Sequence, residues 1–132
     1  MNTLKELKEL LIAEFGPDPD YDRIYKKNGY IVDADIVKIW ILELLNSLSK
    51  VWLKGNILFL KGTSTLLNVL IWKEERDLVV EILMQLGIKK LTISYRNVSK
   101  SYSLRAIMNV FTRYGFAIEW DMDNERFIFK IN

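Results

Sequence analysis

The sequence predicts a single α+β domain over residues 1–132, in which helices pack on a mixed and mostly antiparallel sheet. Three observations predict this class. Apolar residues recur at helical spacing in four segments, and short runs rich in β-branched and aromatic residues lie between them. No Pro-, Gly- or Ser-rich linker divides the chain. The expected order of elements is therefore α-α-β-β-β-α-β-α-β-β.

Four helices are predicted, and most of them have recognisable ends. They are expected at about 3–15, 34–49, 75–86 and 102–114. Thr3 followed by Glu6 is a capping box that begins the first helix, and Asp33 can cap the second. Gly87 and Gly115 are placed to end the third and fourth helices.

The segments between these helices are predicted as loop or strand. Residues 16–31 contain both prolines and show no helical or strand period, so a loop is expected there. Trp52-Leu53-Lys54-Gly55-Asn56 is echoed seven residues later by Phe59-Leu60-Lys61-Gly62-Thr63. Because Gly-Asn and Gly-Thr suit tight turns, this echo predicts three antiparallel strands. The strands expected before the last helix are 51–54, 57–61, 65–72 and 90–95.

The C-terminal residues 117–131 predict a β-hairpin with a two-residue turn at Asp123-Asn124. That turn places Trp120 opposite Phe127, Ile118 opposite Phe129, and Asp121 opposite Arg126. Apolar residues then face apolar residues and an acid faces a base, so the register is self-consistent.

The composition excludes most familiar catalytic and metal chemistry. The chain has no His and no Cys, which removes imidazole catalysis, thiol nucleophiles, disulfides and Cys/His zinc sites. Its glycines are too far apart for a phosphate-binding glycine loop. Asp18, Asp20 and Asp22 have calcium-loop spacing, but Arg23 and Gly29 stand where such a loop needs Gly and Glu. We therefore assign no catalytic, cofactor-binding or metal-binding residue and expect a protein without enzymatic activity.

The charge distribution is more informative than the net charge of +2. No acidic residue occurs in the interval 82–118, whereas residues 1–50 are acidic overall. The interval contains six cations: Lys89, Lys90, Arg96, Lys100, Arg105 and Arg113. They alternate with five aromatic residues: Tyr95, Tyr102, Phe111, Tyr114 and Phe116. Cations that neutralise phosphates and rings that stack on bases suit single-stranded nucleic acid or another polyanion. In the alternative interpretation these cations are the solvated ends of core elements.

The second half of the chain resembles the GNAT N-acetyltransferase superfamily. The run from Asp77 to Phe116 is predicted as helix, strand and a helix that ends in an aromatic residue and Gly-Phe. Asn97 and Tyr114-Gly115-Phe116 are the matching motif residues, and the expected order of elements over 33–132 is similar to that fold.

The resemblance implies a degenerate relative. The family's glycine-containing pyrophosphate loop falls near Trp72–Asp77, which has three acids and no Gly. The family's tyrosine acid falls on Phe111, which cannot transfer a proton. What the resemblance implies is thus the fold, with the acetyl-coenzyme A activity lost.

Two further expectations concern location and partners. The charged, amphipathic N-terminus is unlike a secretory signal, and the apolar segments are too short and too charged to span a membrane. We expect a cytoplasmic protein, or one inside a host cell if a virus or plasmid encodes it. Besides nucleic acid, the expected partners include a protein or a second copy of this chain, contacted through aromatics such as Trp52, Trp72 or Trp120.

Overall fold

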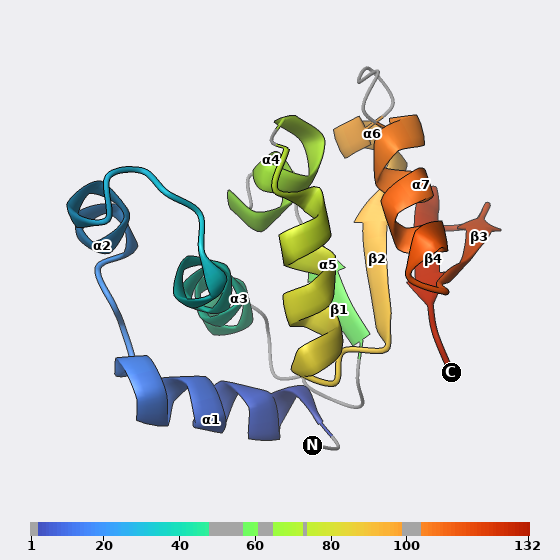
Figure 1. Cartoon of the computed structure of the whole chain (residues 1–132). Helices are drawn as coiled ribbons and strands as arrows, with labels where there is room; N and C mark the ends of the chain where they lie inside the picture. The colour runs from blue at the N-terminus through green and yellow to red at the C-terminus, as the bar shows by residue number, and fades with distance from the viewer. Residues whose placement is uncertain (1–2, 48–56, 61–64, 73, 99–103) are drawn as a thin grey trace.

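The computed structural model describes residues 3–47, 57–60, 65–72, 74–98 and 104–132 (Figure 1). Its helices are α1 (Leu4–Phe15), α2 (Tyr21–Lys27), α3 (Ala34–Ser47), α4 (Thr65–Trp72), α5 (Arg76–Gln85), α6 (Tyr95–Val98) and α7 (Leu104–Arg113). Its strands are β1 (Ile57–Leu60), β2 (Lys90–Ser94), β3 (Ala117–Asp121) and β4 (Arg126–Lys130). The predicted strand 51–54 and the turns on either side of β1 lie outside the described residues. None of the described helices is long and apolar enough to cross a membrane.

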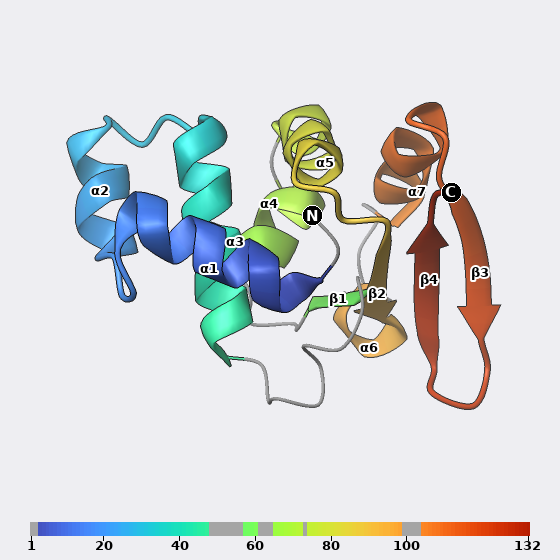
Figure 2. The same cartoon turned by 90° about the horizontal axis from the view of Figure 1, so that it is seen from below.

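The α+β class is confirmed, with helices packed on a mixed sheet. The strand order is β1-β2-β4-β3, in which β1 and β2 are parallel and the two other pairs are antiparallel. Parallel neighbours need a crossover connection, and α4 and α5 lie in the chain between β1 and β2. Helices α1 to α3 gather beyond the β1 edge, whereas α5 and α7 lie along one face of the sheet (Figures 1 and 2).

The register gives the sheet one apolar and one mixed face. Leu58, Leu91, Phe129 and Ile118 form one row across the four strands, and Leu60, Ile93, Phe127 and Trp120 form the next row on that same face. Helix α7 covers part of this apolar face, because the ring of Phe111 lies 4.8 Å from the ring of Phe129. The opposite face is mixed, and there the Arg126 guanidinium lies 5.3 Å from the centre of the Phe59 ring.

Both predicted N-terminal caps are present. The Thr3 hydroxyl accepts a hydrogen bond from the Glu6 amide at 3.1 Å and begins α1. Asp33 accepts one from the Ile36 amide at 2.9 Å and begins α3. Among the buried residues of these two helices are Leu7, Leu11 and Trp40. The predicted helices at 75–86 and 102–114 and the strand at 90–95 are also found, within one or two residues at the ends that the structure describes.

The expected loop at 16–31 is wrong in part, because α2 lies within it. Asp20 accepts a hydrogen bond from the Arg23 amide and caps this helix. Tyr21, Ile24 and Tyr25 follow at helical spacing and pack against the core. The two prolines precede the cap, so they do not interrupt the helix.

The expected strand at 65–72 is also wrong, since these residues form α4. Apolar residues occupy nearly every position, so their spacing does not distinguish a strand from a buried helix. Leu66, Leu67 and Leu70 are completely buried in the core, and the Arg76 side chain donates to the carbonyls of Leu70 and Ile71 near the end of the helix. Strand β1 therefore pairs in parallel with β2 in place of an antiparallel neighbour.

The C-terminal hairpin has the predicted register, with Trp120 opposite Phe127 and Asp121 opposite Arg126. Its connection differs from the prediction, because the four residues 122–125 lie between the strand ends. Glu125 adopts a left-handed conformation with φ of 49°, and the Asn124 amide donates to the Asp121 carboxylate at 3.3 Å.

Candidate functional site

Five of the six predicted cations lie in the described part of the chain, and these five do not lie on one surface. Lys89 and Lys90 are at the start of β2, and Arg96 is in α6, which follows the other end of that strand. Lys90 lies on the mixed sheet face, opposite to α7. Arg105 and Arg113 are exposed at the two ends of α7, and Lys100 lies outside the described residues.

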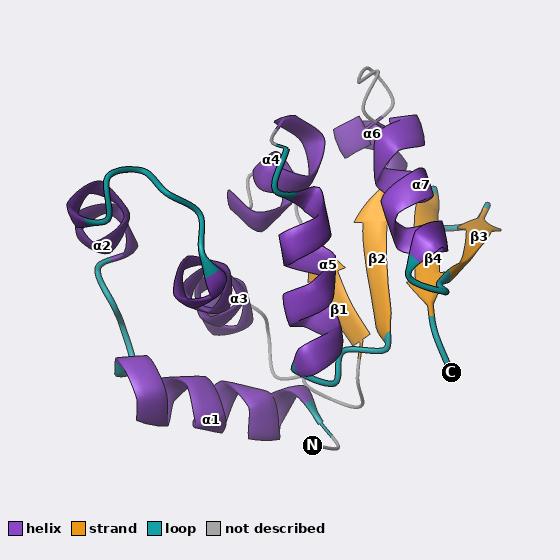
Figure 3. Cartoon of the chain, in the orientation of Figure 1, coloured by secondary structure: helices purple, strands orange, loops and turns teal. Residues whose placement is uncertain are grey.

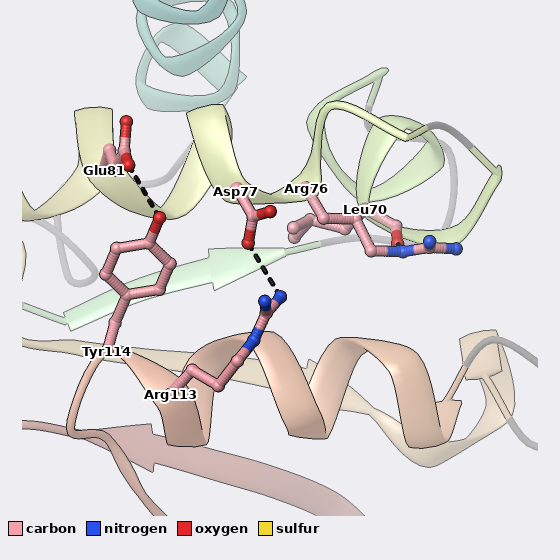
Figure 4. Close-up of polar contacts among 6 residues, drawn as sticks. All are labelled: Leu70, Arg76, Asp77, Glu81, Arg113 and Tyr114. Atoms are coloured by element: carbon pink, nitrogen blue, oxygen red, sulfur yellow. Dashed lines mark hydrogen bonds and ion pairs between the residues drawn. The ribbon is translucent and has the colours of Figure 1, made fainter.

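Arg113 is engaged by an acidic partner (Figure 4). Its guanidinium forms an ion pair with the Asp77 carboxylate of α5 at 2.8 Å. One residue later, the Tyr114 hydroxyl donates to the Glu81 carboxylate at 2.7 Å. This hydrogen bond to Glu81 raises the pKa of Tyr114 to about 12. The two contacts fasten the end of α7 to α5, so Arg113 has a structural partner before any ligand binds.

A groove of about 670 Å³ lies between α5 and α7 beside this ion pair. Its charged lining is balanced, with Glu74 and Asp77 against Arg76 and Arg113. The Arg76 side chain also donates hydrogen bonds to the carbonyls of Leu70 and Ile71 in α4, and Figure 4 shows it beside Leu70. The groove therefore offers no net positive charge for a phosphate.

The aromatic residues of the basic interval also separate into buried and exposed groups. Phe111 and Phe116 are buried in the core with their rings 5.1 Å apart, so they cannot stack on a ligand. The hydroxyl of Tyr114 is hydrogen-bonded to the Glu81 carboxylate. Tyr95 is exposed, with 44% of its surface accessible, whereas Tyr102 lies outside the described residues.

Tyr95 belongs to a cluster with Trp120, which is exposed, and Phe127, which is half-buried; we call this cluster the aromatic platform. The rings of Tyr95 and Trp120 meet edge to face at 5.5 Å, and those of Trp120 and Phe127 lie 4.9 Å apart. Trp120 is 45% exposed, and neighbouring Met122 is more exposed still. The hairpin register predicts the contact of Trp120 with Phe127, but the interval 82–118 excludes both residues. Their contact with Tyr95 depends on the pairing of β2 with β4.

The polar surroundings of the platform are well defined. The Tyr95 amide donates to the Glu125 carbonyl at 2.9 Å, which holds the start of α6 against the hairpin connection. Arg96 follows immediately and is exposed. The exposed side chains of Asp123 and Glu125 make the hairpin connection acidic. The platform therefore has a cation on α6 and two carboxylates at the hairpin tip.

Asp121 at the end of β3 is neutralised locally. Its carboxylate accepts hydrogen bonds from the Asn124 amide group at 2.9 Å and from Arg126 at 3.0 Å. The bond from Asn124, followed by that from Arg126, lowers the pKa of Asp121. Arg126 is thus paired and is not an additional free cation beside the platform.

Within the described ranges, no group of three or more acidic side chains is arranged to hold a metal ion. Of the three aspartates with calcium-loop spacing, Asp20 caps α2 and Asp22 lies in its first turn. Both positions favour carboxylates for reasons of helix stability alone.

No protein family, curated relative or solved structure matches this chain. The resemblance to GNAT acetyltransferases therefore stays a prediction. Phe111, at the position of that family's tyrosine acid, is completely buried between Phe116 and Phe129.

Proposed function

We propose that the protein is a non-enzymatic binding module that holds single-stranded nucleic acid on the aromatic platform. The observation that supports this most directly is the contact of exposed Tyr95 and Trp120 with half-buried Phe127, in a cluster whose Tyr95 is followed in the chain by exposed Arg96. Every base has a π-face, and stacking on an aromatic side chain contributes about 1–3 kcal/mol per base without requiring a particular sequence.

The electrostatic part of this proposal rests on Arg96 and Arg105. Both are exposed, and both lie in the acid-free interval 82–118. Arg113 is left out because Asp77 holds it, and Lys90 is left out because it lies on the opposite sheet face. We therefore expect both stacking on the platform and phosphate contacts by Arg96 and Arg105 to contribute to affinity.

Binding of a short labelled oligodeoxythymidine, followed by fluorescence anisotropy, tests the proposal. We expect Trp120→Ala to weaken binding about tenfold or more, as the loss of one stacked base predicts. Arg96→Glu combined with Arg105→Glu is expected to abolish it. For the unmodified protein, the logarithm of the affinity should fall with the logarithm of salt by about 0.7 for each phosphate neutralised.

The matched control is Tyr30→Ala, which removes an exposed tyrosine from the helical side of the molecule and should leave binding unchanged. Absent or salt-independent binding to both DNA and RNA would overturn the proposal. Light scattering accompanies the titration, because exposed aromatics also favour self-association. Dimerisation that Trp120→Ala abolishes, without any oligonucleotide binding, would assign the platform to a second copy of the chain.

A further inference from the structure

A second group of aromatic side chains lines a pocket on the helical side of the molecule, away from the aromatic platform. The pocket has a volume of about 410 Å³ and lies between α2, α3 and α4. Trp40 and Val69 are buried and form its floor, whereas Tyr21 and Tyr25 are half-buried and Asn68 is exposed at the rim. Small-molecule sites have volumes of roughly 300–1,000 Å³ and mostly apolar walls with a few polar groups. This pocket has that size and that composition.

The walls of the pocket present flat aromatic faces. The rings of Tyr21 and Tyr25 are stacked, with centres 5.7 Å apart and planes 13° from parallel. Both rings meet Trp40 at steep angles, 60° for Tyr21 and 66° for Tyr25. A planar ring that enters the pocket can therefore stack against one wall and meet another edge to face.

The floor of the pocket holds a polar group without a proper partner. The indole Nε1 of Trp40 is buried and has no hydrogen bond of ordinary geometry in the described part of the chain. It lies near enough to the Tyr21 hydroxyl to lower its pKa, although burial raises that pKa by more. A buried N–H whose nearby hydroxyl is poorly placed to accept is incompletely satisfied, so a well-placed acceptor atom supplied by a ligand would be favoured there.

The electrostatic surroundings of the pocket disfavour anions. The described residues that line the pocket include no charged side chain, so an anion would find no cation there. After burial, the exposed carboxylates of Asp22 and Glu43 also contribute to the raised pKa of the Tyr21 hydroxyl. A phosphate brought close to these carboxylates would be repelled. The ligand that fits this environment is planar, carries a hydrogen-bond acceptor on its ring and bears no phosphate.

We propose that the pocket between α2, α3 and α4 binds an uncharged nitrogen heterocycle, such as an unphosphorylated nucleoside, with a ring acceptor bonded to the Trp40 N–H. This site differs from the aromatic platform in residues, in enclosure and in its selection against phosphate. It does not depend on the proposed nucleic-acid function.

Titration with adenosine, followed by NMR of the tryptophan indole N–H signals, tests this site. We expect a saturable downfield shift of the Trp40 signal, because that proton gains an acceptor. Trp40→Phe keeps an aromatic ring and removes the donor, so it should weaken adenosine binding about tenfold. The matched control is Trp120→Phe, which makes the same change in the aromatic platform and should leave adenosine binding unchanged.

Two additional measurements keep the proposal testable if Trp40→Phe disturbs folding. Asn68→Phe places a bulky ring at the exposed rim and is expected to abolish binding in a folded protein. Adenosine monophosphate should bind at least several-fold more weakly than adenosine, because the uncharged lining of the pocket offers its phosphate no cation.

The outcomes separate this site from the platform. Loss of adenosine binding in Asn68→Phe, with adenosine binding retained in Trp120→Phe, supports a separate pocket. A Trp40 signal unmoved by adenosine would overturn the proposal, and so would tighter binding of tetramethylammonium than of adenosine, which would indicate a cation cage. Loss of adenosine binding in Trp120→Phe would also overturn it, by placing the ligand on the platform.

Discussion

The two aromatic clusters of this protein have similar chemistry and opposite surroundings. In the cluster of α2 and α3, Tyr21 and Tyr25 stand over a buried Trp40 and enclose a pocket. At the sheet end, Tyr95 and Trp120 are exposed, and exposed Arg96 follows Tyr95 in the chain. The two clusters are carried by different elements, since the first lies on helices α2 and α3 and the second on α6 and the β3–β4 hairpin (Figure 3). The first arrangement suits a small ligand, and the second suits a chain that runs across it.

The strongest test of this contrast is truncation of the central tryptophan in each cluster. We expect Trp40→Ala to lower the free energy of unfolding by about 3–5 kcal/mol, since it leaves a cavity in the core. Trp120→Ala removes a half-exposed ring and should cost about 1 kcal/mol, the size of one aromatic contact. Urea denaturation measures both. Equal costs would show that the two clusters are not differently enclosed.

The helix caps provide a smaller test of the helical region. Thr3→Ala removes the hydroxyl that accepts from the Glu6 amide and should lower the free energy of unfolding by about 1 kcal/mol. Thr112→Ala is the matched control, because this exposed hydroxyl donates to a carbonyl within its own helix and caps nothing. Its expected effect is within about 0.5 kcal/mol. If Thr112→Ala destabilised the protein more than Thr3→Ala, loss of the helix cap would not explain the effect of Thr3→Ala.

Lowering the pH should change the contributions of Glu43 and Asp121 to the free energy of unfolding in opposite directions. Burial, with a further contribution from Asp22, raises the pKa of Glu43 above 4.5, so its contribution to stability is full at low pH and is lost as pH rises through the raised value. The pKa of Asp121 is lowered below 3.8, so its contribution is present above that value and is lost as pH falls.

Stability measured by urea denaturation between neutral pH and about pH 3 separates these effects. Compared with the unmodified protein, Glu43→Gln should be more stable near neutral pH, and the difference should shrink in acid. Asp121→Asn should be less stable near neutral pH, with its difference shrinking only in the most acidic samples. If both variants were more stable, or both less stable, than the unmodified protein near neutral pH, the opposite pKa shifts assigned to Glu43 and Asp121 would be wrong.

The smallest expected effect concerns Tyr114, which joins α7 to α5 at some distance from both clusters. Its pKa is raised from 10.0 to about 12, so the contact stabilises the fold at neutral pH and is lost as pH rises through that range. Tyr114→Phe and Glu81→Gln should each flatten the alkaline loss of stability. If only one of these two variants lost the decrease in stability at alkaline pH, the hydrogen bond between Tyr114 and Glu81 would not be the cause of that decrease.

Much of the fold follows from local patterns in the sequence. The caps at Thr3 and Asp33 and the register of the C-terminal hairpin involve residues close together in the chain. The missed helix α2 was also within reach, because Asp20 and the spacing of Tyr21, Ile24 and Tyr25 are local signals. The prolines before it obscured that pattern.

Long-range packing decided the remaining features. Residues 65–72 are apolar at almost every position, so packing of Leu66, Leu67 and Leu70 in the core, not periodicity, made them helix α4. The partner of β1 is β2, more than twenty residues away from it in the chain, and no local turn specifies such a parallel pair.

The same distinction applies to the candidate sites. The sequence by itself determined a polarised chain, with acids concentrated early and an acid-free interval at 82–118. The tertiary structure decided which of those cations can contribute to the platform. Asp77 forms an ion pair with Arg113, and the sheet places Lys90 on the face opposite to the platform. The tertiary structure also gathered Tyr95 with Trp120, and Tyr21 with Trp40, from separate elements. Composition specifies which side chains are available, but only the packing of distant elements determines which of them meet and which remain exposed.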